Sequence, residues 1–167
     1  MKFKIDNFLL ERMDVEDVSH LAFEKRLIEK NQDHFVKEMH ERLHHPMKKN
    51  DYFQLECAYL VSNETDLIGY LYVSGLERNI IYLEYLIVEE YRRKGYASRL
   101  IDRVSHYLFT NFPVEKITLD IDMSNYPSMK TAEKAGFYYD EEEYSQGNNR
   151  LSFERINPFY KERKRER

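Results

Sequence analysis

The segment Arg92–Ala97 combines three neighbouring cations with a glycine, Gly95. It lies between an apolar run, Ile80–Val88, and a stretch whose apolar residues recur at helical spacing. Glycine lets backbone amides approach a ligand closely, and the start of a helix directs N–H groups and the positive end of its dipole outward. A junction of this kind binds anions, so the sequence predicts a phosphate site here.

A single carboxylate, Glu84, interrupts the apolar run that precedes this turn. If Glu84 faces a cleft, partial burial would make it a useful general base for deprotonating an amine. If it lies on a closed sheet face, it would pair with a lysine or arginine of a neighbouring strand. The sequence leaves both interpretations open.

A second pattern, His40-Glu41-Arg42-Leu43-His44, fits the His-Glu-x-x-His spacing of zinc hydrolases, in which His40 and His44 bind zinc and Glu41 acts as base. Charged neighbours surround it, Pro46 ends the helix almost at once, and no obvious third ligand follows on the next helix. We interpret it as a solvated helix face and expect no metal.

Composition limits the class of protein. The chain has 167 residues and a formal net charge of −4, which predicts one domain over residues 1–160 and argues against general nucleic-acid binding. Residues 161–167 form a basic tail. Cys57 is the single cysteine, and no apolar stretch approaches the length of a signal peptide core or membrane helix. We therefore expect a cytoplasmic protein without a membrane partner; a homodimer stays possible.

Periodicity and turn residues predict a mixed α+β protein, with helices on both faces of one sheet. The β–α–β step around residues 80–122 requires a parallel pair, and the remaining pairs are expected to be antiparallel. In chain order, the expected elements are a strand over 3–10, helices from Asp14 and over 33–45, strands over 52–61, 67–76 and 80–88, a helix over 95–109, a strand over 116–122, a helix from Ser124 or Asn125 to Gly136, and a hairpin of 137–144 with 151–156.

Two motifs in this order resemble the GCN5-related N-acetyltransferase (GNAT) superfamily. The first signature, Gln/Arg-x-x-Gly-x-Gly/Ala after a strand that ends in valine, reads Arg92 to Ala97 after Val88. The second, an asparagine followed by a helix that ends in Gly-Phe, reads Asn125 to Phe137. The resemblance implies a GNAT-like fold, a central mixed sheet of about seven strands flanked by about four helices, and acetyl-CoA as co-substrate.

The resemblance also implies which residues bind acetyl-CoA. The turn would hold the pyrophosphate, the exposed backbone at the end of the central strand would pair with the pantetheine arm, and the motif asparagine would contact pantetheine as well. A backbone N–H of Ile87 or Val88 would stabilise the thioester oxygen. The implied set is Leu86, Ile87, Val88, Arg92, Arg93, Lys94, Gly95, Tyr96, Ala97, Ser98, Asn125 and Ser128.

The chain departs from the family pattern at Ala132. Many members carry a tyrosine seven residues after the motif asparagine, and this tyrosine protonates the leaving thiolate. Ser128, Tyr126, Tyr138 and Tyr139 are substitutes for the acid, and protonation by the amine or by water is the other route. The departure keeps open a non-catalytic CoA-binding module of the same fold, beside the zinc hydrolase considered above.

The resemblance predicts transfer of an acetyl group from acetyl-CoA to a primary amine of a small molecule or peptide, by direct attack in a ternary complex. An acidic run, Asp140–Glu143, follows the Gly-Phe motif. It would attract a cationic acceptor through its field, or it is a solvated loop.

Overall fold

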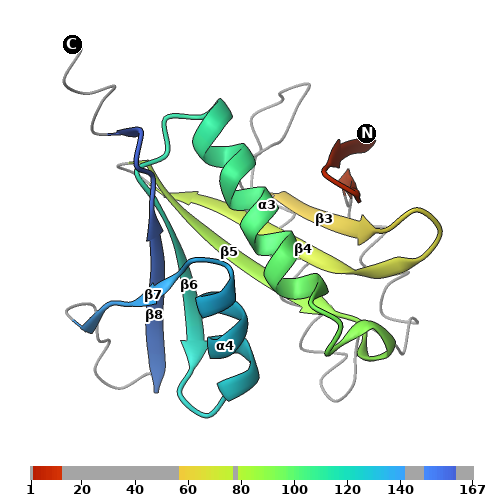
Figure 1. Ribbon diagram of the computed structural model, residues 1–167. Helices are drawn as coiled ribbons and strands as arrows, with labels where there is room; N and C mark the ends of the chain where they lie inside the picture. Colours follow the sequence, from red (N-terminus) through yellow and green to blue (C-terminus); the bar gives the residue numbers. More distant parts are fainter. Residues whose placement is uncertain (1, 13–56, 77–78, 142–148, 161–167) are drawn as a thin grey trace. The chain divides into compact units, whose positions relative to one another are not determined.

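The computed structural model describes residues 2–12, 57–76, 79–141 and 149–160 (Figure 1). These residues divide into two compact units, each described by itself. The first comprises residues 1–74 and 85–96, and the second comprises residues 75–84 and 97–167. The helices predicted from Asp14 and over 33–45 lie outside the described residues, as do the His40–His44 pattern and the tail.

The first unit opens with two antiparallel strands, β1 (Lys2–Ile5) and β2 (Phe8–Arg12), where the sequence predicted one. That prediction was wrong because Asp6 adopts a positive φ of 54°, a turn conformation that aspartate tolerates better than most residues. β2 pairs with β3 (Cys57–Ser62), which pairs with β4 (Leu67–Leu76). Both pairs are antiparallel, as predicted for the 52–76 region.

β5 (Ile80–Ile87) belongs to both units, and its residues alternate between buried and half-buried up to Glu84. In the second unit it runs parallel to β6 (Lys116–Asp122), which confirms the predicted parallel step. The strand order is β1-β2-β3-β4-β5-β6-β8-β7, so the sheet has eight strands rather than about seven. The extra strand comes from the opening hairpin.

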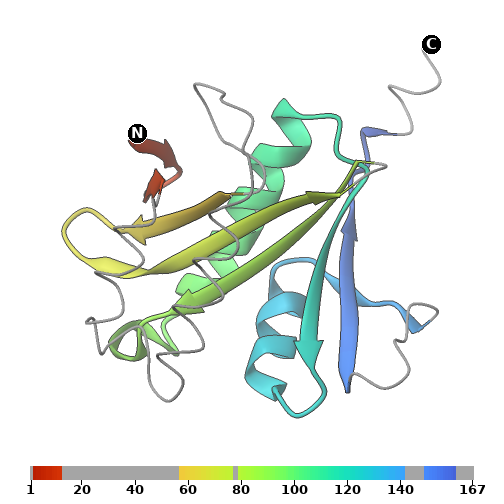
Figure 2. The same cartoon turned by 180° about the vertical axis from the view of Figure 1, so that it is seen from behind.

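The closing hairpin of the second unit is β7 (Tyr138–Tyr139) and β8 (Arg150–Ile156), with β8 antiparallel to both β6 and β7. Figure 2 shows β6 and β8 side by side. β7 is shorter than the predicted 137–144, because Asp140 and Glu141, which disfavour strands, follow it directly.

Two α-helices are described; both lie in the second unit except for Tyr96, the first residue of α3, which belongs to the first. α3 (Tyr96–Asn111) begins one residue after the predicted start, since Gly95 has a φ of 79°. It ends two residues later than predicted, where Thr110 Oγ1 and Asn111 Nδ2 donate to the carbonyl oxygens of His106 and Tyr107. α4 (Tyr126–Lys134) starts after its cap residue Asn125, as predicted.

α3 and α4 are anchored to very different degrees. Six residues of α3 are buried, most of them apolar. In α4 only Ala132 is buried, although Ala135 and Phe137 just beyond it are buried too. The buried residues of α3 are Leu100, Ile101, Val104, Ser105, Leu108 and Phe109.

Candidate active site

In the first unit, the end of β5 is fixed against β4 through backbone contacts. The Val88 N–H donates to the Ile68 carbonyl oxygen at 2.8 Å. A Cβ on Gly69 would overlap the carbonyl oxygen of Leu86 and lie 3.1 Å from the Cα of Ile87. Residue 69 must therefore be glycine for β5 to lie this close to β4. Of the two amides considered for the thioester oxygen, that of Val88 donates to β4.

Arg92 is the first cation of the turn, and its side chain folds back onto the strand. Its Nε donates to the Ile87 carbonyl oxygen at 2.8 Å in a partly buried contact. The turn and the strand end are thereby tied together over five residues of sequence. Arg92 is predicted to bind the phosphate, and the structure adds a positioning contact for it.

Two residues of the turn have a left-handed backbone. Arg93 has a φ of 64° and Gly95 a φ of 79°, whereas Lys94 between them does not have a positive φ. Successive N–H groups of a turn with left-handed residues can point toward one anion, so this backbone is compatible with an anion site. No atom lies within 4 Å of a Cβ built on Gly95, so its backbone angle, and not crowding, requires glycine there.

Side chains of the turn pack around Tyr91. Its ring meets that of Tyr96 edge to face at 5.8 Å between centroids, and Lys94 Nζ lies 5.5 Å from its ring centre. Arg93, Lys94 and Gly95 are exposed. The turn therefore offers positive charge at the surface while Arg92 and Tyr91 hold its base.

The turn leads into α3, whose first turn contains no acidic residue. The positive end of the helix dipole is thus not offset by a carboxylate of its own first turn. These observations fit the phosphate site predicted for the turn and helix start. The individual CoA contacts assigned to Leu86–Val88, Arg93–Ser98, Asn125 and Ser128 stay predictions.

The second motif residue, Asn125, caps α4 in the second unit. Its Oδ1 accepts the Ser128 N–H at 3.2 Å, and Pro127 occupies the first turn. Asn125 is exposed and Ser128 half-buried. The side-chain oxygen of Asn125 is used for capping. Its amide nitrogen is therefore the group relevant to the predicted pantetheine contact.

The loop before this cap is organised by Asp122. Its Oδ1 accepts hydrogen bonds from the Ser124 hydroxyl at 2.6 Å and from the Ser124 N–H at 2.9 Å. These bonds, the hydroxyl first, lower the pKa of Asp122 from its usual 3.8. The hydrogen bonds from Ser124 therefore favour the ionised form of Asp122 in the loop before α4.

Glu84 is half-buried, and the sheet register shows which face carries it. Arg155 contacts α3 and pairs in register with Ile117, so odd-numbered residues of β6 face α3. Tyr82 pairs with Thr118, which places Tyr82 and Glu84 on the opposite face. The β5–β6 ladder ends at this pair, while β6 continues to pair with β8 as far as Asp122.

Asp120 was overlooked in the sequence. It is exposed on β6, two residues beyond Thr118, and it shares the face that carries Glu84. The signal was available, since Asp120 and Asp122 break the apolar alternation of this strand on one side only. The carboxylate of Asp120 on β6 thus lies on the strand next to β5, which carries the candidate base Glu84.

Tyr138 lies on the same face of the sheet as Glu84. Two strands, β6 and β8, separate its strand, β7, from β5. Three strand spacings of about 4.8 Å put Tyr138 and β5 roughly 14 Å apart. Burial raises the pKa of Tyr138, and Glu154, which shares a hydrogen bond with it, raises it further. Both features weaken Tyr138 as an acid working with Glu84.

The other acid candidates lie on α4. Tyr126 is the first residue of the helix and 67% exposed, and Ser128 follows within the first turn. Ala132, in the position where many family members carry tyrosine, is fully buried. Core packing therefore accounts for Ala132.

Among the described ranges, no three His, Cys, Asp or Glu side chains lie close enough to hold a metal ion. No helix in the described part of the chain is long and apolar enough to cross a membrane.

The model of the "Acetyltransferase (GNAT) family" matches residues 21–137 of this chain. Over 51 residues the chain is 37% identical to an N-alpha-acetyltransferase of Saccharolobus solfataricus. That stretch is 30% of this chain and 30% of the relative, so the chain matches less than a third of the length of this curated protein.

Three solved structures share the fold at low sequence identity. An acetyltransferase of the GNAT family from Bacillus anthracis has a TM-score of 0.68 at 14% identity, over 94% of this chain and 99% of that one. A spermidine N-acetyltransferase chimera from Vibrio cholerae and hSSAT has 0.67 at 18%, over 93% and 98%. RimL, a ribosomal alpha-N-protein acetyltransferase in complex with coenzyme A, has 0.65 at 14%, over 93% and 98%.

Proposed function

Since the chain belongs to the acetyltransferase (GNAT) family, whose members use acetyl-CoA, we propose that it acetylates a primary amine of a small molecule or peptide. The carrying observation is the β5–α3 junction, where positive φ angles at Arg93 and Gly95 precede a helix start without acidic residues. This backbone fits a pyrophosphate, and the exposed cations beside it complement the charge.

The proposal assigns a role in acetyl-CoA binding to each part of the site. The turn amides from Arg93 onward bind the pyrophosphate. The edge of β5 beyond Tyr82, where the ladder with β6 has ended, pairs with the amides of the pantetheine arm, as an added strand would. The amide nitrogen of Asn125 donates to the same arm.

When bound, acetyl-CoA supplies an activated acetyl group as a thioester. The chain must then take a proton from the acceptor ammonium and present hydrogen-bond donors to the thioester oxygen. Glu84 is the base in this proposal, directly or through water, and Asp120 is the second carboxylate on that face. The Ile87 N–H is the donor to the oxygen, and Ser128 or Tyr126 is the proton donor to the leaving sulfur.

The acceptor is proposed to be cationic. Structural neighbours include a spermidine N-acetyltransferase and a ribosomal alpha-N-protein acetyltransferase, so polyamines and protein N-termini are the two acceptor classes to test first. Asp140 and Glu141 lie at the end of β7, and Asp140 follows Tyr138 on the face that carries Glu84. Their field favours a cation near this face.

The proposal is tested by following thiol release from acetyl-CoA with polyamines, N-terminal peptides and simple amines as acceptors. We expect Glu84→Gln to lower kcat by about 10²-fold or more, because the variant has no base to take the proton of the acceptor. Asp120→Asn is the matched variant on the neighbouring strand. If only Asp120→Asn shows this loss, the base assignment moves to Asp120.

Two outcomes contradict the proposal as a whole. If acetyl-CoA does not raise the melting temperature of the protein at high ligand concentration, there is no acyl-CoA site. If it binds but no amine releases thiol, the chain is the CoA-binding module that the buried Ala132 also allows.

A further inference from the structure

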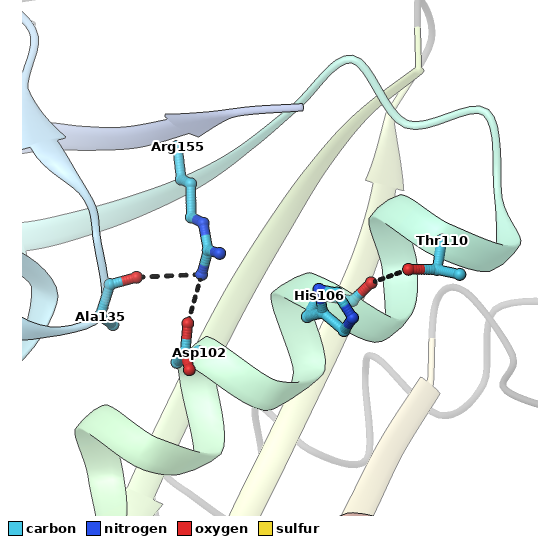
Figure 3. A network of polar contacts seen from close by, with 5 residues as sticks. All are labelled: Asp102, His106, Thr110, Ala135 and Arg155. Atoms are coloured by element: carbon cyan, nitrogen blue, oxygen red, sulfur yellow. Dashed lines mark hydrogen bonds and ion pairs between the residues drawn. The ribbon is translucent and has the colours of Figure 1, made fainter. Parts of the chain in front are cut away.

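One arginine of β8, Arg155, joins three elements of the second unit. In Figure 3 its guanidinium points from β8 to α3 and to the chain just after α4. Its Nη1 donates to Asp102 Oδ1 at 2.7 Å and to the Ala135 carbonyl oxygen at 3.1 Å. Its Cζ lies 5.7 Å from the centre of the Phe109 ring.

The chain reversal after α4 fits around this side chain. Gly136 has a φ of 86°, and a Cβ built there would meet Cδ, Nε and Cζ of Arg155 at 3.6 to 3.7 Å. The guanidinium therefore packs along the backbone of the helix end as well as bonding to it. A cation at this end of a helix is also favoured by the helix dipole.

The contact does little for stability by itself. The side chains of Arg155 and Asp102 are 24% and 39% exposed, and ion pairs of this exposure contribute little to stability. What the contact fixes is the direction of the α4 axis. Ala132 is the one fully buried residue of α4, Met129 is half-buried, and the buried Ala135 and Phe137 follow its end, so apolar burial is concentrated toward the C-terminal end of the helix.

The functional end of α4 is the opposite one, with Asn125 at its cap. The helix is about 12 Å long, so a tilt of roughly 10° about its C-terminal end moves the cap by about 2 Å. A hydrogen bond from Asn125 would be lost over such a displacement, and misplacements of about 1 Å can cost about 10²-fold in rate. The anchor at Ala135 thereby controls where the cap lies.

We infer that Arg155 is a positioning residue for acetyl-CoA, acting through α4: with Asp102 as its support, it sets the helix direction that places Asn125 against the pantetheine arm. This inference rests on the proposed function. It concerns the pantetheine half of the ligand and not the phosphate half, which the β5–α3 turn binds.

That division supplies the test. Adenosine 3′,5′-bisphosphate carries phosphates but no pantetheine, whereas coenzyme A carries both. We expect Arg155→Met to weaken coenzyme A binding about tenfold, by calorimetry, while adenosine 3′,5′-bisphosphate binds about as tightly as to the parent protein. In turnover, KM for acetyl-CoA rises more than kcat falls.

Three further variants make the experiment decisive. Arg155→Lys keeps one cation but cannot reproduce the planar fork, so it restores part of the coenzyme A affinity. Asp102→Asn removes the charge that orients Arg155 and lies between the parent protein and Arg155→Met. Arg103→Met removes an exposed arginine next to Asp102 on α3 and leaves both affinities unchanged.

The results separate this inference from the proposed function. Equal loss of both ligands with a parallel fall in melting temperature shows a general structural role and overturns the inference, as does unchanged coenzyme A binding. If Arg155→Met does not fold, Arg155→Lys and Asp102→Asn answer the same question. If the parent protein binds no coenzyme A, the proposed function has failed instead.

Discussion

Both described helices follow a strand, and their starts are built in different ways. Between β5 and α3 the backbone itself is unusual, with left-handed residues at Arg93 and Gly95. Between β6 and α4 side chains do the work, since Asp122 binds Ser124 and Asn125 binds Ser128. A helix start that is closed by its own side chains has less capacity for an anion than one formed by an open backbone turn.

The two helices also differ in the contacts that hold them in place. The β5–α3 turn is tied to the strand by Arg92 and rests on the close approach of β4 at Gly69. α3 is then held along its length by six buried residues. α4 has one fully buried residue, Ala132, near its far end, where the Arg155 contact also lies. One start is built into the sheet, while the other depends on an anchor a helix length away.

Substitutions at Gly69 and Gly95 break the first junction in distinguishable ways. Gly69→Ala forces a Cβ onto the Leu86 backbone, which cannot move without breaking the β4–β5 pairing. We expect a loss of more than about 3 kcal/mol in the free energy of unfolding, or no folded protein, measured by urea titration. Loss of less than 1 kcal/mol would show that β5 relaxes away from β4.

At Gly95 the space is open and only the backbone angle resists substitution. Gly95→Ala is expected to cost about 1–2 kcal/mol in stability. It should also weaken acetyl-CoA binding about tenfold, because the turn amides lose their alignment. Asp6→Ala is the matched control, since Asp6 also has a positive φ, in the exposed β1–β2 turn. If both variants lower acetyl-CoA affinity equally, the turn is not the phosphate site.

Asn125 tests the second junction, because two roles coincide in one side chain. Asn125→Ala removes the cap and should cost about 1 kcal/mol. Asn125→Asp keeps an oxygen that accepts the Ser128 N–H but removes the amide donor, so stability should be retained. If KM for acetyl-CoA rises in Asn125→Asp as well, the amide contacts the pantetheine arm. An unchanged KM leaves Asn125 as a cap alone.

Local signals account for what the sequence predicted well. The apolar run of β5, the glycine before α3, and the Asn125, Pro127 and Gly136 signals of α4 each act within a few residues of where they stand. The family match of residues 21–137 confirms the resemblance that two of these signals carried. Asp6 was the exception, because an aspartate without a neighbouring glycine is a weak turn signal.

What escaped prediction depends on contacts between residues far apart in the chain. From the sequence alone, Gly69 would be interpreted as a residue that weakens its strand. The structure shows that it allows the close approach of the Leu86 backbone. Arg155 reads as one charge in a closing strand, yet its partners Asp102 and Ala135 lie 53 and 20 residues away. Asp120 became relevant only when the register placed it on the face of Glu84. Periodicity carries none of this information.

The smallest expected effect concerns the loop that leads to α4. The folded state lowers the pKa of Asp122 below 3.8, so it binds this proton less tightly than the unfolded chain does. The resulting stabilisation is fully present above about pH 4 and is lost as pH falls through the folded pKa. Asp122 is fully exposed, so the effect on stability should be small but measurable by urea titration at pH 7 and pH 3.

Asp122→Asn separates the charge from the hydrogen bonds, because an amide oxygen can still accept from Ser124. We expect the parent protein to be more stable than Asp122→Asn at pH 7 and the difference to shrink at pH 3, as the pH falls toward the lowered pKa of this carboxyl. A difference that is the same at both pH values would mean that the ionised carboxylate does not hold the loop. The start of α4 would then depend on its Asn125 cap and its Arg155 anchor, and the contrast with the backbone-built start of α3 would be sharper still.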